Sequence, residues 1–202
     1  MGSATQVGSR NSWPRTIVEE GVALRNGSQS SVSLTTELLA RADRHDARLG
    51  TYLCRFDESA LQAAEEADLE LASGHDRGPL HGIPVAVKDN IATSEQRLTA
   101  QSRSPLDGWS YMGDAPVVRR LRSAGAVIIG KTTLNEFAVG LPDPEKQFPI
   151  PTNPWDDSLW AGGSSSGTAN GVAAGLFLGG LGTDTGGSIR LPSAFCGVTG
   201  LK

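Results

Sequence analysis

Apolar positions recur with a helical period in the first third of the chain. Over residues 34–42 they fall on one face of a helix, and Ser33 is placed to be its N-cap. A second helix is expected from Ser59, with alanines on one face, glutamates on the other, and Gly74 placed to end it. The pattern therefore predicts two amphipathic helices whose charged sides face solvent.

Further along, short β-branched runs alternate with helical segments. Residues 83–87 predict a half-buried strand, and the apolar run 126–130 predicts a buried one. Helices are expected at 116–124 and 132–140, before a proline-rich and irregular connection over 141–154. Alternating strands and helices are typical of an α/β protein.

The composition is that of a soluble globular domain. The chain has 202 residues, 38% hydrophobic and 20% charged, which is enough for one domain with a substantial core. A formal charge of -4 argues against nucleic acid as a direct partner, because phosphate binding requires a basic face. Cys54 and Cys196 lack the spacing of a zinc site and are expected to be buried free thiols.

The N-terminal region differs in composition from the rest. Residues 1–33 are rich in Ser, Gly and Asn, which predicts a loosely ordered arm with a short helix over 15–25, ahead of a domain over 34–202. The start of the chain lacks the apolar segment of a signal peptide, and the apolar stretch 171–181 is too short to span a bilayer. We therefore expect a cytoplasmic protein without membrane contact.

Glycine is concentrated near the end of the sequence. Of the 25 glycines, 12 lie between Gly162 and Gly200, which indicates special backbone geometry and hence a site. A phosphate-binding P-loop is excluded, because Ser188 stands where its lysine would be. A dinucleotide-binding fingerprint is not convincingly present either.

The segment 163–167 spells G-x-S-x-G, the nucleophile elbow of α/β-hydrolases. That mechanism requires a later histidine, whereas all three histidines lie upstream. A lysine that burial keeps neutral can serve as the base instead. Lys88, at the end of the apolar strand, is the candidate, although its position alone fits a solvent-exposed strand end better.

Four stretches, in this order, resemble the amidase signature family of serine hydrolases. They are GIPVAVKDN (82–90), GKTTLNEFAVG (130–140), NPWDDSLWAGGSSSG (153–167) and GLGTDTGGSIRLPSAFCGVTGLK (182–202). The resemblance runs from Leu34 to the last residue and covers the amino-terminal part of the family's domain. It implies a mixed β-sheet with helices on both faces. With later strands missing, its open edge would favour self-association.

The resemblance also implies a Ser-Ser-Lys triad that uses neither a metal nor an organic cofactor. Ser188 would attack an amide carbonyl, Ser164, on a cis peptide bond, would relay the proton, and Lys88 would receive it. Backbone N–H groups beside the nucleophile would bind the oxyanion. The other implied site residues are Thr185, Gly186 and Gly187 in the oxyanion hole, and Ser165, Asp184 and Arg190 as supporting or substrate-binding groups.

Three functions are open at this point. The first is a free-standing amidase that hydrolyses a small carboxamide through an acyl-enzyme, and the proline-rich connection over 141–154 favours it. The second is the glutaminase subunit of a tRNA-dependent amidotransferase, which shares the triad. The third is a catalytically incomplete fragment of an amidase.

Overall fold

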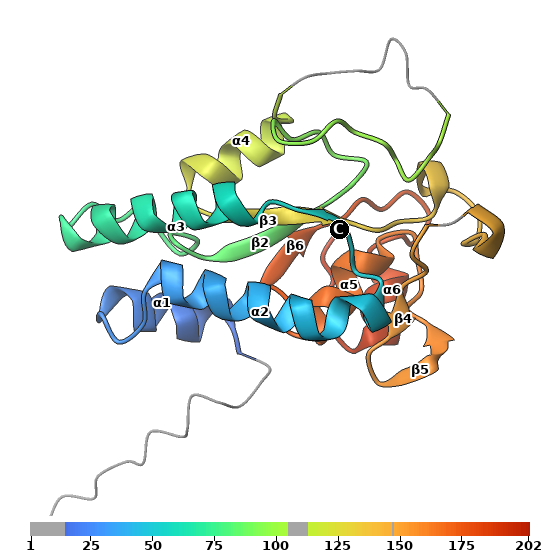
Figure 1. Cartoon of the computed structure of the whole chain (residues 1–202), viewed down its shortest axis with the longest axis horizontal. Coiled ribbons are helices and arrows are strands. Elements are labelled where there is room, and N and C mark those ends of the chain that lie inside the picture. Colours follow the sequence, from blue (N-terminus) through green and yellow to red (C-terminus); the bar gives the residue numbers. More distant parts are fainter. Residues whose placement is uncertain (1–14, 105–112, 147) are drawn as a thin grey trace, which may run out of the picture.

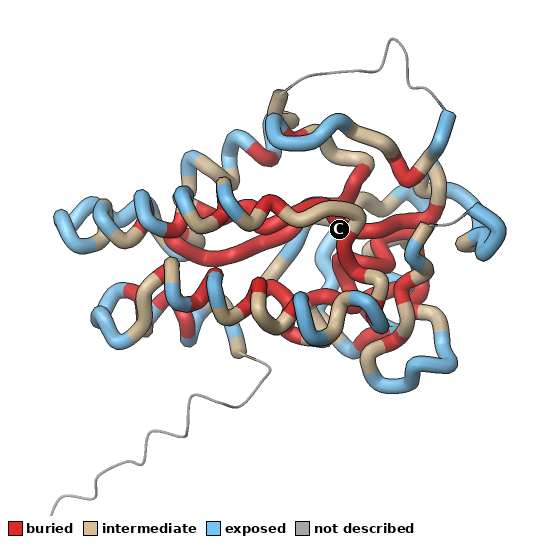
Figure 2. Tube along the Cα trace, viewed as in Figure 1, coloured by how far each residue is buried: buried red, intermediate tan, exposed pale blue. Residues whose placement is uncertain are grey.

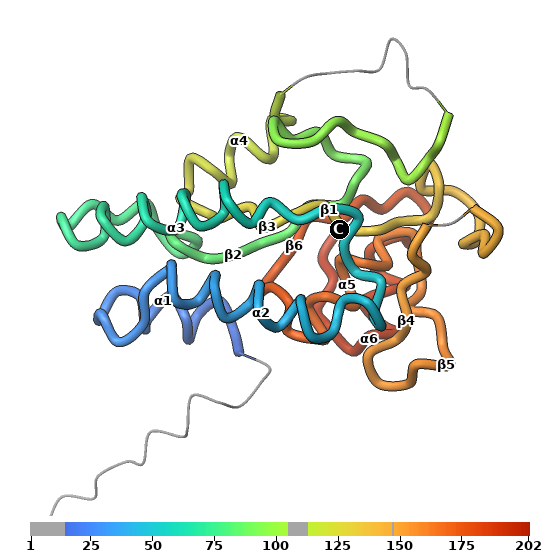
Figure 3. Tube along the Cα trace, viewed as in Figure 1, coloured from blue at the N-terminus to red at the C-terminus, as the bar shows by residue number. Residues whose placement is uncertain are grey.

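A mixed four-stranded sheet forms the centre of the structure, a computed structural model that describes residues 15–104, 113–146 and 148–202. Its strands are β1 (Tyr52–Arg55), β2 (Pro84–Lys88), β3 (Val127–Thr132) and β6 (Gly179–Leu181). They follow the order β1-β3-β2-β6, in which only β1 is antiparallel to its neighbour. Figure 3 shows how β2 and β6, far apart in the sequence, lie next to each other.

Helices flank this sheet. They are α1 (Ile17–Arg25), α2 (Ser31–Leu49), α3 (Asp57–Ala72), α4 (Pro116–Ser123), α5 (Ser166–Ala173) and α6 (Arg190–Cys196). In Figure 1, α4 lies on one side of the sheet and α1 and α2 on the other, while α3 contacts both β3 and α2. α5 packs against β2, β3 and β6 and carries α6 on its outer side. The expected α/β fold, a mixed sheet flanked by helices, is confirmed.

The two central strands are buried along their whole length, as the red tube in Figure 2 shows. The prediction that residues 83–87 form a half-buried strand was therefore wrong. A parallel strand with a neighbour on each side and helices over the sheet is covered on both faces. The alternation of β-branched residues thus reflects strand propensity and not a solvated face. The core around these strands includes Leu34, Leu38, Ile83, Ile128 and Phe177.

The N-terminal part of the described chain packs on the domain. α1 begins with a capping box formed by Thr16 and Glu19, and Leu24 from this helix lies in the core. This helix buries apolar area against the rest of the domain. The loosely ordered arm expected over 1–33 therefore does not extend through α1. The first part of the expected arm, 1–14, lies outside the described residues.

Both amphipathic helices are present, with earlier starts than expected. α2 begins at Ser31, and the N-cap is Ser30, whose hydroxyl accepts a hydrogen bond from the N–H of Ser33 at 3.0 Å. The prediction that Ser33 caps this helix was wrong, because two serines three residues apart both suit the position. α3 begins at Asp57, two residues before Ser59.

The helix expected over 132–140 is not formed. Its first residue completes β3, and a single 3-10 turn, η1 (Glu136–Ala138), follows. Phe137 and Ala138 have φ angles of 52° and 61°, a left-handed conformation that an α-helix does not contain. The apolar spacing of this segment therefore belongs to a loop that follows the end of the strand.

The proline-rich connection is irregular, as expected. It contains the short 3-10 turn η2 (Pro144–Lys146) and ends at β4 (Thr152–Asn153), which forms a small antiparallel hairpin with the next strand, β5 (Asp156–Trp160). This hairpin leads directly into the Gly-Ser segment, so it fixes where that segment enters the domain.

The two cysteines are free, as the sequence predicts, but only Cys196 is buried. Cys54 is half-buried because β1 is an edge strand of the sheet. Within the part of the chain that the structure describes, no helix combines the length and the apolar character needed to cross a bilayer.

Candidate active site

Lys88 is the last residue of β2, and its side chain is fully buried. Because β2 lies between β3 and β6, the loops that follow these strands surround its carboxyl end. In open α/β sheets, this end of the parallel strands is where functional groups gather. The central position of β2 explains why Lys88 lies inside the protein and not at a solvent-exposed strand end.

Three hydroxyl groups surround the Lys88 amine. Lys88 Nζ lies 2.8 Å from Ser164 Oγ, 2.9 Å from Ser165 Oγ and 2.9 Å from Thr183 Oγ1. The two serines come from the loop before α5, whereas Thr183 follows β6. Two parts of the Gly-Ser region therefore converge on one lysine.

The hydrogen bonds around the three hydroxyls distinguish their roles. Ser165 Oγ donates to the Thr183 carbonyl at 3.2 Å, so its proton is engaged. Thr183 Oγ1 accepts from Asn90 Nδ2 at 2.9 Å as well as from Lys88. Ser164 Oγ forms a hydrogen bond only with Lys88 among the described residues. A neutral amine has two N–H groups and one lone pair. Lys88 can therefore donate to the hydroxyls of Ser165 and Thr183 and accept the proton of Ser164.

Burial lowers the pKa of Lys88 to about 7, and this effect outweighs the opposing attraction of the Asp184 charge. Removing an amine from water disfavours its charged form, and hydroxyl groups do not neutralise the charge as a carboxylate would. At neutral pH a substantial fraction of Lys88 therefore carries the lone pair that a base requires.

The backbone around Ser164 is closely packed. The Gly163–Ser164 peptide bond is cis, as the resemblance to amidases implied. A β-carbon added at Gly163 would come within 2.7 Å of the Trp160 ring and 2.9 Å of Asn135 Oδ1. Only glycine therefore fits at position 163, where the backbone passes close to these side chains. Ser164 itself is almost fully buried.

Asp184 organises the loop that carries Ser188. Its carboxylate accepts hydrogen bonds from the N–H of Gly187 at 2.9 Å and from that of Ile189 at 3.1 Å. The Arg190 guanidinium adds two bonds, at 2.9 and 3.0 Å. The arginine and these backbone donors hold the pKa of Asp184 well below its usual range. The carboxylate therefore stays charged and closes the loop into a tight turn, in which Gly187 has φ +135°.

Ser188 joins the other groups through its backbone. Its carbonyl accepts a hydrogen bond from the Ser165 N–H at 3.0 Å. Its hydroxyl forms no hydrogen bond with any residue that the structure describes, so the link from Ser188 Oγ to Ser164 is not made here. The structure thus brings Lys88, Ser164 and Ser165 into direct contact and holds Ser188 beside them.

The N–H groups of this loop are not equivalent. That of Gly187 is engaged with Asp184. Those of Thr185, Gly186 and Ser188 form no hydrogen bond within the described residues. Of the positions expected in an oxyanion hole, Thr185 and Gly186 therefore have donors to offer in this conformation, and Gly187 contributes the turn.

Sequence reasoning missed Thr183 and Asn90. Both lie inside stretches that carry the family resemblance, and Thr183 stands five residues before Ser188. The available signal was chemical, because a buried amine needs several hydrogen-bond partners and the resemblance supplied only one. Asking which hydroxyls and amides flank the motif lysine and the motif serines would have suggested both residues.

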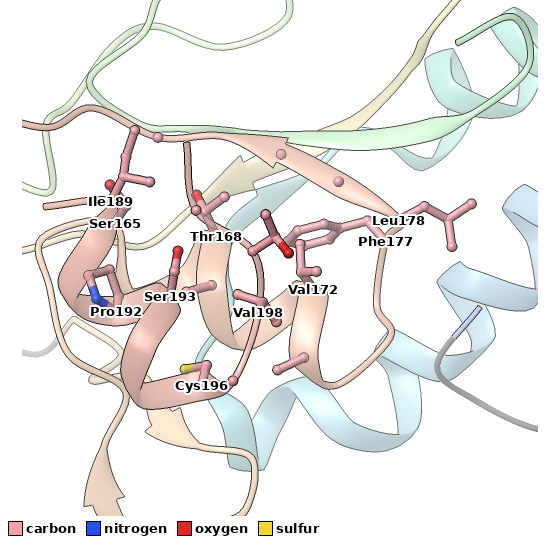
Figure 4. A pocket seen from close by; sticks show the side chains of 18 of the residues that line it. Ser165, Thr168, Val172, Phe177, Leu178, Ile189, Pro192, Ser193, Cys196 and Val198 are labelled. Carbon is pink, nitrogen blue, oxygen red and sulfur yellow. The ribbon is translucent and has the colours of Figure 1, made fainter. Parts of the chain in front are cut away.

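A pocket of about 810 Å³ adjoins this site between β6, α5 and α6 (Figure 4). Ser165 and Ile189 lie at one end of it, and Phe177 and Leu178 lie at the other. Its lining is mostly apolar and does not include Lys88. The pocket is therefore next to the lysine and its hydroxyls and does not enclose them. No group of three or more His, Cys, Asp or Glu side chains that could hold a metal ion is found within the described ranges.

The chain belongs to the amidase family, because a family model described as Amidase matches residues 33–202. It is 42% identical to a chloroplastic/mitochondrial glutamyl-tRNA(Gln) amidotransferase subunit of Sorghum bicolor, over 98% of this chain and 39% of the relative. It is 45% identical to the corresponding glutamyl-tRNA(Gln) amidotransferase subunit of Methylococcus capsulatus, over 93% of this chain and 38% of that one. The chain thus spans about two fifths of the length of these relatives.

Solved structures agree with this assignment. The native peptide amidase of Stenotrophomonas maltophilia superimposes with a TM-score of 0.80 at 36% identity, over 90% of this chain and 38% of that chain. These values show a shared fold over the described part of the domain.

Proposed function

We propose that this chain carries the reaction centre of an amidase, which cleaves a carboxamide C–N bond through an acyl-enzyme. The observation that carries the proposal is the 2.8 Å contact between the buried Lys88 Nζ and Ser164 Oγ. A buried amine with a pKa of about 7 is a competent base at neutral pH. A serine that contacts it can pass protons in both directions.

The proposed reaction has two stages. Ser188 Oγ attacks the amide carbonyl carbon and gives its proton to Ser164 Oγ, whose own proton moves to the lone pair of Lys88 Nζ. The protons then return along the same path to the nitrogen of the leaving amine, and the C–N bond breaks. A water molecule repeats the sequence on the ester, which releases the carboxylate and restores Ser188.

The oxyanion of each tetrahedral intermediate would lie against backbone donors. The N–H groups of Thr185, Gly186 and Ser188 are the candidates, since that of Gly187 already serves Asp184. Donors of this kind typically contribute roughly 3 kcal/mol each to lowering the barrier. Asp184 and Arg190 act through the loop and do not touch the reacting atoms in this scheme.

A serine-directed fluorophosphonate probe tests the proposal, because it labels only an activated nucleophile. We expect labelling of the parent chain, loss of labelling in Ser188→Ala, and retention in Ser73→Ala, an exposed serine at the end of α3. A folded parent chain that takes up no label would contradict the proposal and favour the catalytically incomplete fragment. Hydrolysis of simple aliphatic and aryl amides is the accompanying assay.

The glutaminase subunit of a tRNA-dependent amidotransferase is the second candidate. The identity of 42% to the Sorghum bicolor amidotransferase subunit favours it. Release of ammonia from glutamine only when partner subunits are added would support this candidate, whereas turnover of simple amides by the isolated chain supports a free-standing amidase. A cytoplasmic location stays a prediction under either function.

A further inference from the structure

A second buried lysine, Lys131, lies on the neighbouring strand β3. Lys131 Nζ pairs with Asp89 Oδ1 at 2.9 Å, and both side chains are almost completely shielded from solvent. Asp89 follows Lys88 in the chain, and Lys131 lies on β3 opposite Val87. The proposed reaction uses neither of them.

We infer that the Asp89–Lys131 ion pair positions Lys88: it holds the turn that follows β2, and it compensates the buried charge of Asp89, the residue next to Lys88 in the chain. The inference rests on the proposed function of Lys88 as a base. Lys131 and Asp89 are positioning residues in this sense, since neither would touch the substrate.

The ion pair fixes the turn after β2 at two points. Lys131 Nζ also donates to the Ile91 carbonyl at 2.8 Å, so one ammonium binds both the side chain of residue 89 and the backbone of residue 91. Between them stands Asn90, whose amide donates to Thr183, one of the partners of Lys88. The Ile91 N–H closes the turn onto the Lys88 carbonyl at 3.0 Å.

The other carboxylate oxygen of Asp89 fastens this turn to the next loop. Asp89 Oδ2 accepts hydrogen bonds from the hydroxyl and the N–H of Thr99 and from the N–H of Gln101. The Gln101 side chain in turn accepts from the Leu134 N–H at 2.8 Å. The loops after β2 and β3 are therefore tied together around the ion pair.

The ion pair also removes a net charge from the surroundings of Lys88. The charged group that acts on Lys88 is Asp184 from the loop after β6, with Arg190 bound to it and Lys202 at 3.8 Å. The Asp89–Lys131 pair begins one residue further along the chain, and its two charges compensate each other. From β1, the Cys54 thiol faces that pair, and its pKa is raised by burial and by Asp89. An unpaired Asp89 would leave an uncompensated negative charge buried one residue along the chain from Lys88, and such a charge favours the ammonium form of the amine. Lys131 prevents this.

Opposite charge changes in the ion pair should therefore shift the titration midpoint of Lys88 in opposite directions. Lys131→Met leaves Asp89 uncompensated and should raise the midpoint of Lys88 titration by about one pH unit, whereas Asp89→Asn leaves Lys131 uncompensated and should lower it by a similar amount. The double variant should return close to the parent midpoint. A purely structural role would instead shift both single variants in the same direction, or neither of them.

Nuclear magnetic resonance of ¹³C-lysine protein measures these midpoints without any turnover. The chain has four lysines, Lys88, Lys131, Lys146 and Lys202, so the Cε signals can be assigned with one substitution each. Lys131→Arg keeps the charge and is the matched control, with a midpoint like that of the parent. Cys54 reactivity provides a second reporter, because its thiol pKa should move in the same direction as that of Lys88 in each variant.

The outcomes are distinct. Opposite shifts of the Lys88 midpoint support the inference, and equal or absent shifts in folded single variants overturn it. If Lys131→Met does not fold, Lys131→Gln, which keeps a donor for the Ile91 carbonyl, takes its place with the same expected rise. A chain that shows the opposite shifts but labels with no serine probe would contradict the proposed function and leave the ion-pair inference standing.

Discussion

Two lysines occupy adjacent central strands of the same sheet and are equally buried, but their surroundings differ. Lys131 on β3 meets the carboxylate of Asp89 at 2.9 Å. Lys88 on β2 meets three hydroxyl groups and forms no ion pair with any described residue. Depth in the protein is the same in both cases, so the partner decides what each lysine can do.

This contrast shows how one sheet can hold both a structural and a chemical lysine. An ammonium that is paired and hydrogen-bonded can stay charged in a protein interior. An ammonium that meets only hydroxyl oxygens lacks a compensating charge, and burial lowers the pKa of Lys88 to about 7. Lys131 is therefore suited to holding loops together, and Lys88 to moving protons.

The largest expected effect separates the two lysines by activity. Lys88→Met should lower kcat/KM for a simple amide by about a thousandfold, within the range for loss of a general base. The exposed Lys146→Met serves as the control and should keep parent activity. Steady-state kinetics on both variants, with circular dichroism to verify folding, makes the comparison. A folded Lys88→Met chain with activity within about tenfold of the parent would remove Lys88 from the mechanism.

For stability we expect the reverse order, with a larger loss when Lys131 is replaced than when Lys88 is replaced. Lys131→Met leaves the Asp89 carboxylate buried without its counter-charge, a change that typically costs about 3–5 kcal/mol. Lys88→Met leaves no charge behind and should cost less. Urea unfolding of the two variants at pH 7 measures both values. A smaller loss for Lys131→Met than for Lys88→Met would refute the structural role assigned to the pair.

The order of elements was accessible from the sequence, whereas their degree of burial was not. Helical periodicity located α2 and α3, and short β-branched runs located β2 and β3. Alternation over 83–87 predicts one exposed face, and the strand is buried on both, because a sequence does not state which strands will lie in the middle of a sheet. The segment 132–140 has helical apolar spacing but forms a loop, because tertiary contacts override local periodicity there.

In the candidate site, too, the sequence identifies some residues and leaves their contacts undetermined. Motifs pointed to Lys88, Ser164 and Ser188, since the chemistry needs those residue types and the family resemblance supplies the spacing. The hydrogen bonds around them could not be derived, because Thr183 reaches Lys88, and Asn90 reaches Thr183, only once β6 lies beside β2. The orientation of the Gly187 N–H toward Asp184 is likewise a property of the folded turn.

The lowered pKa of Lys88 has a consequence for stability against pH. Between the folded value of about 7 and the ordinary value of about 10.4, the unfolded chain binds more protons at this group than the folded chain. Its contribution to the free energy of unfolding therefore rises with pH across this window, by on the order of 4 kcal/mol, and is constant below it. The difference in unfolding free energy between parent and Lys88→Met, measured from about pH 7 to about pH 10, isolates this group. A pH-independent difference would mean that Lys88 titrates like a solvated lysine.

The smallest predicted effect tests the hydroxyls themselves. Thr183→Val removes an acceptor of a Lys88 N–H and an acceptor of Asn90 without a large change in volume, so the amine is held less firmly toward Ser164. We expect kcat/KM to fall about tenfold, the equivalent of one lost hydrogen bond. The acid limb of the pH profile should also move to lower pH, because the ammonium form loses more than the neutral form. Thr132→Val is the matched control, since that hydroxyl lies beside Lys88 in register but bonds to Thr168. If both variants lower activity equally and neither moves the acid limb, the Thr183 hydroxyl contributes only to packing. The contrast between Lys88 and Lys131 must then come from burial without a contribution from Thr183.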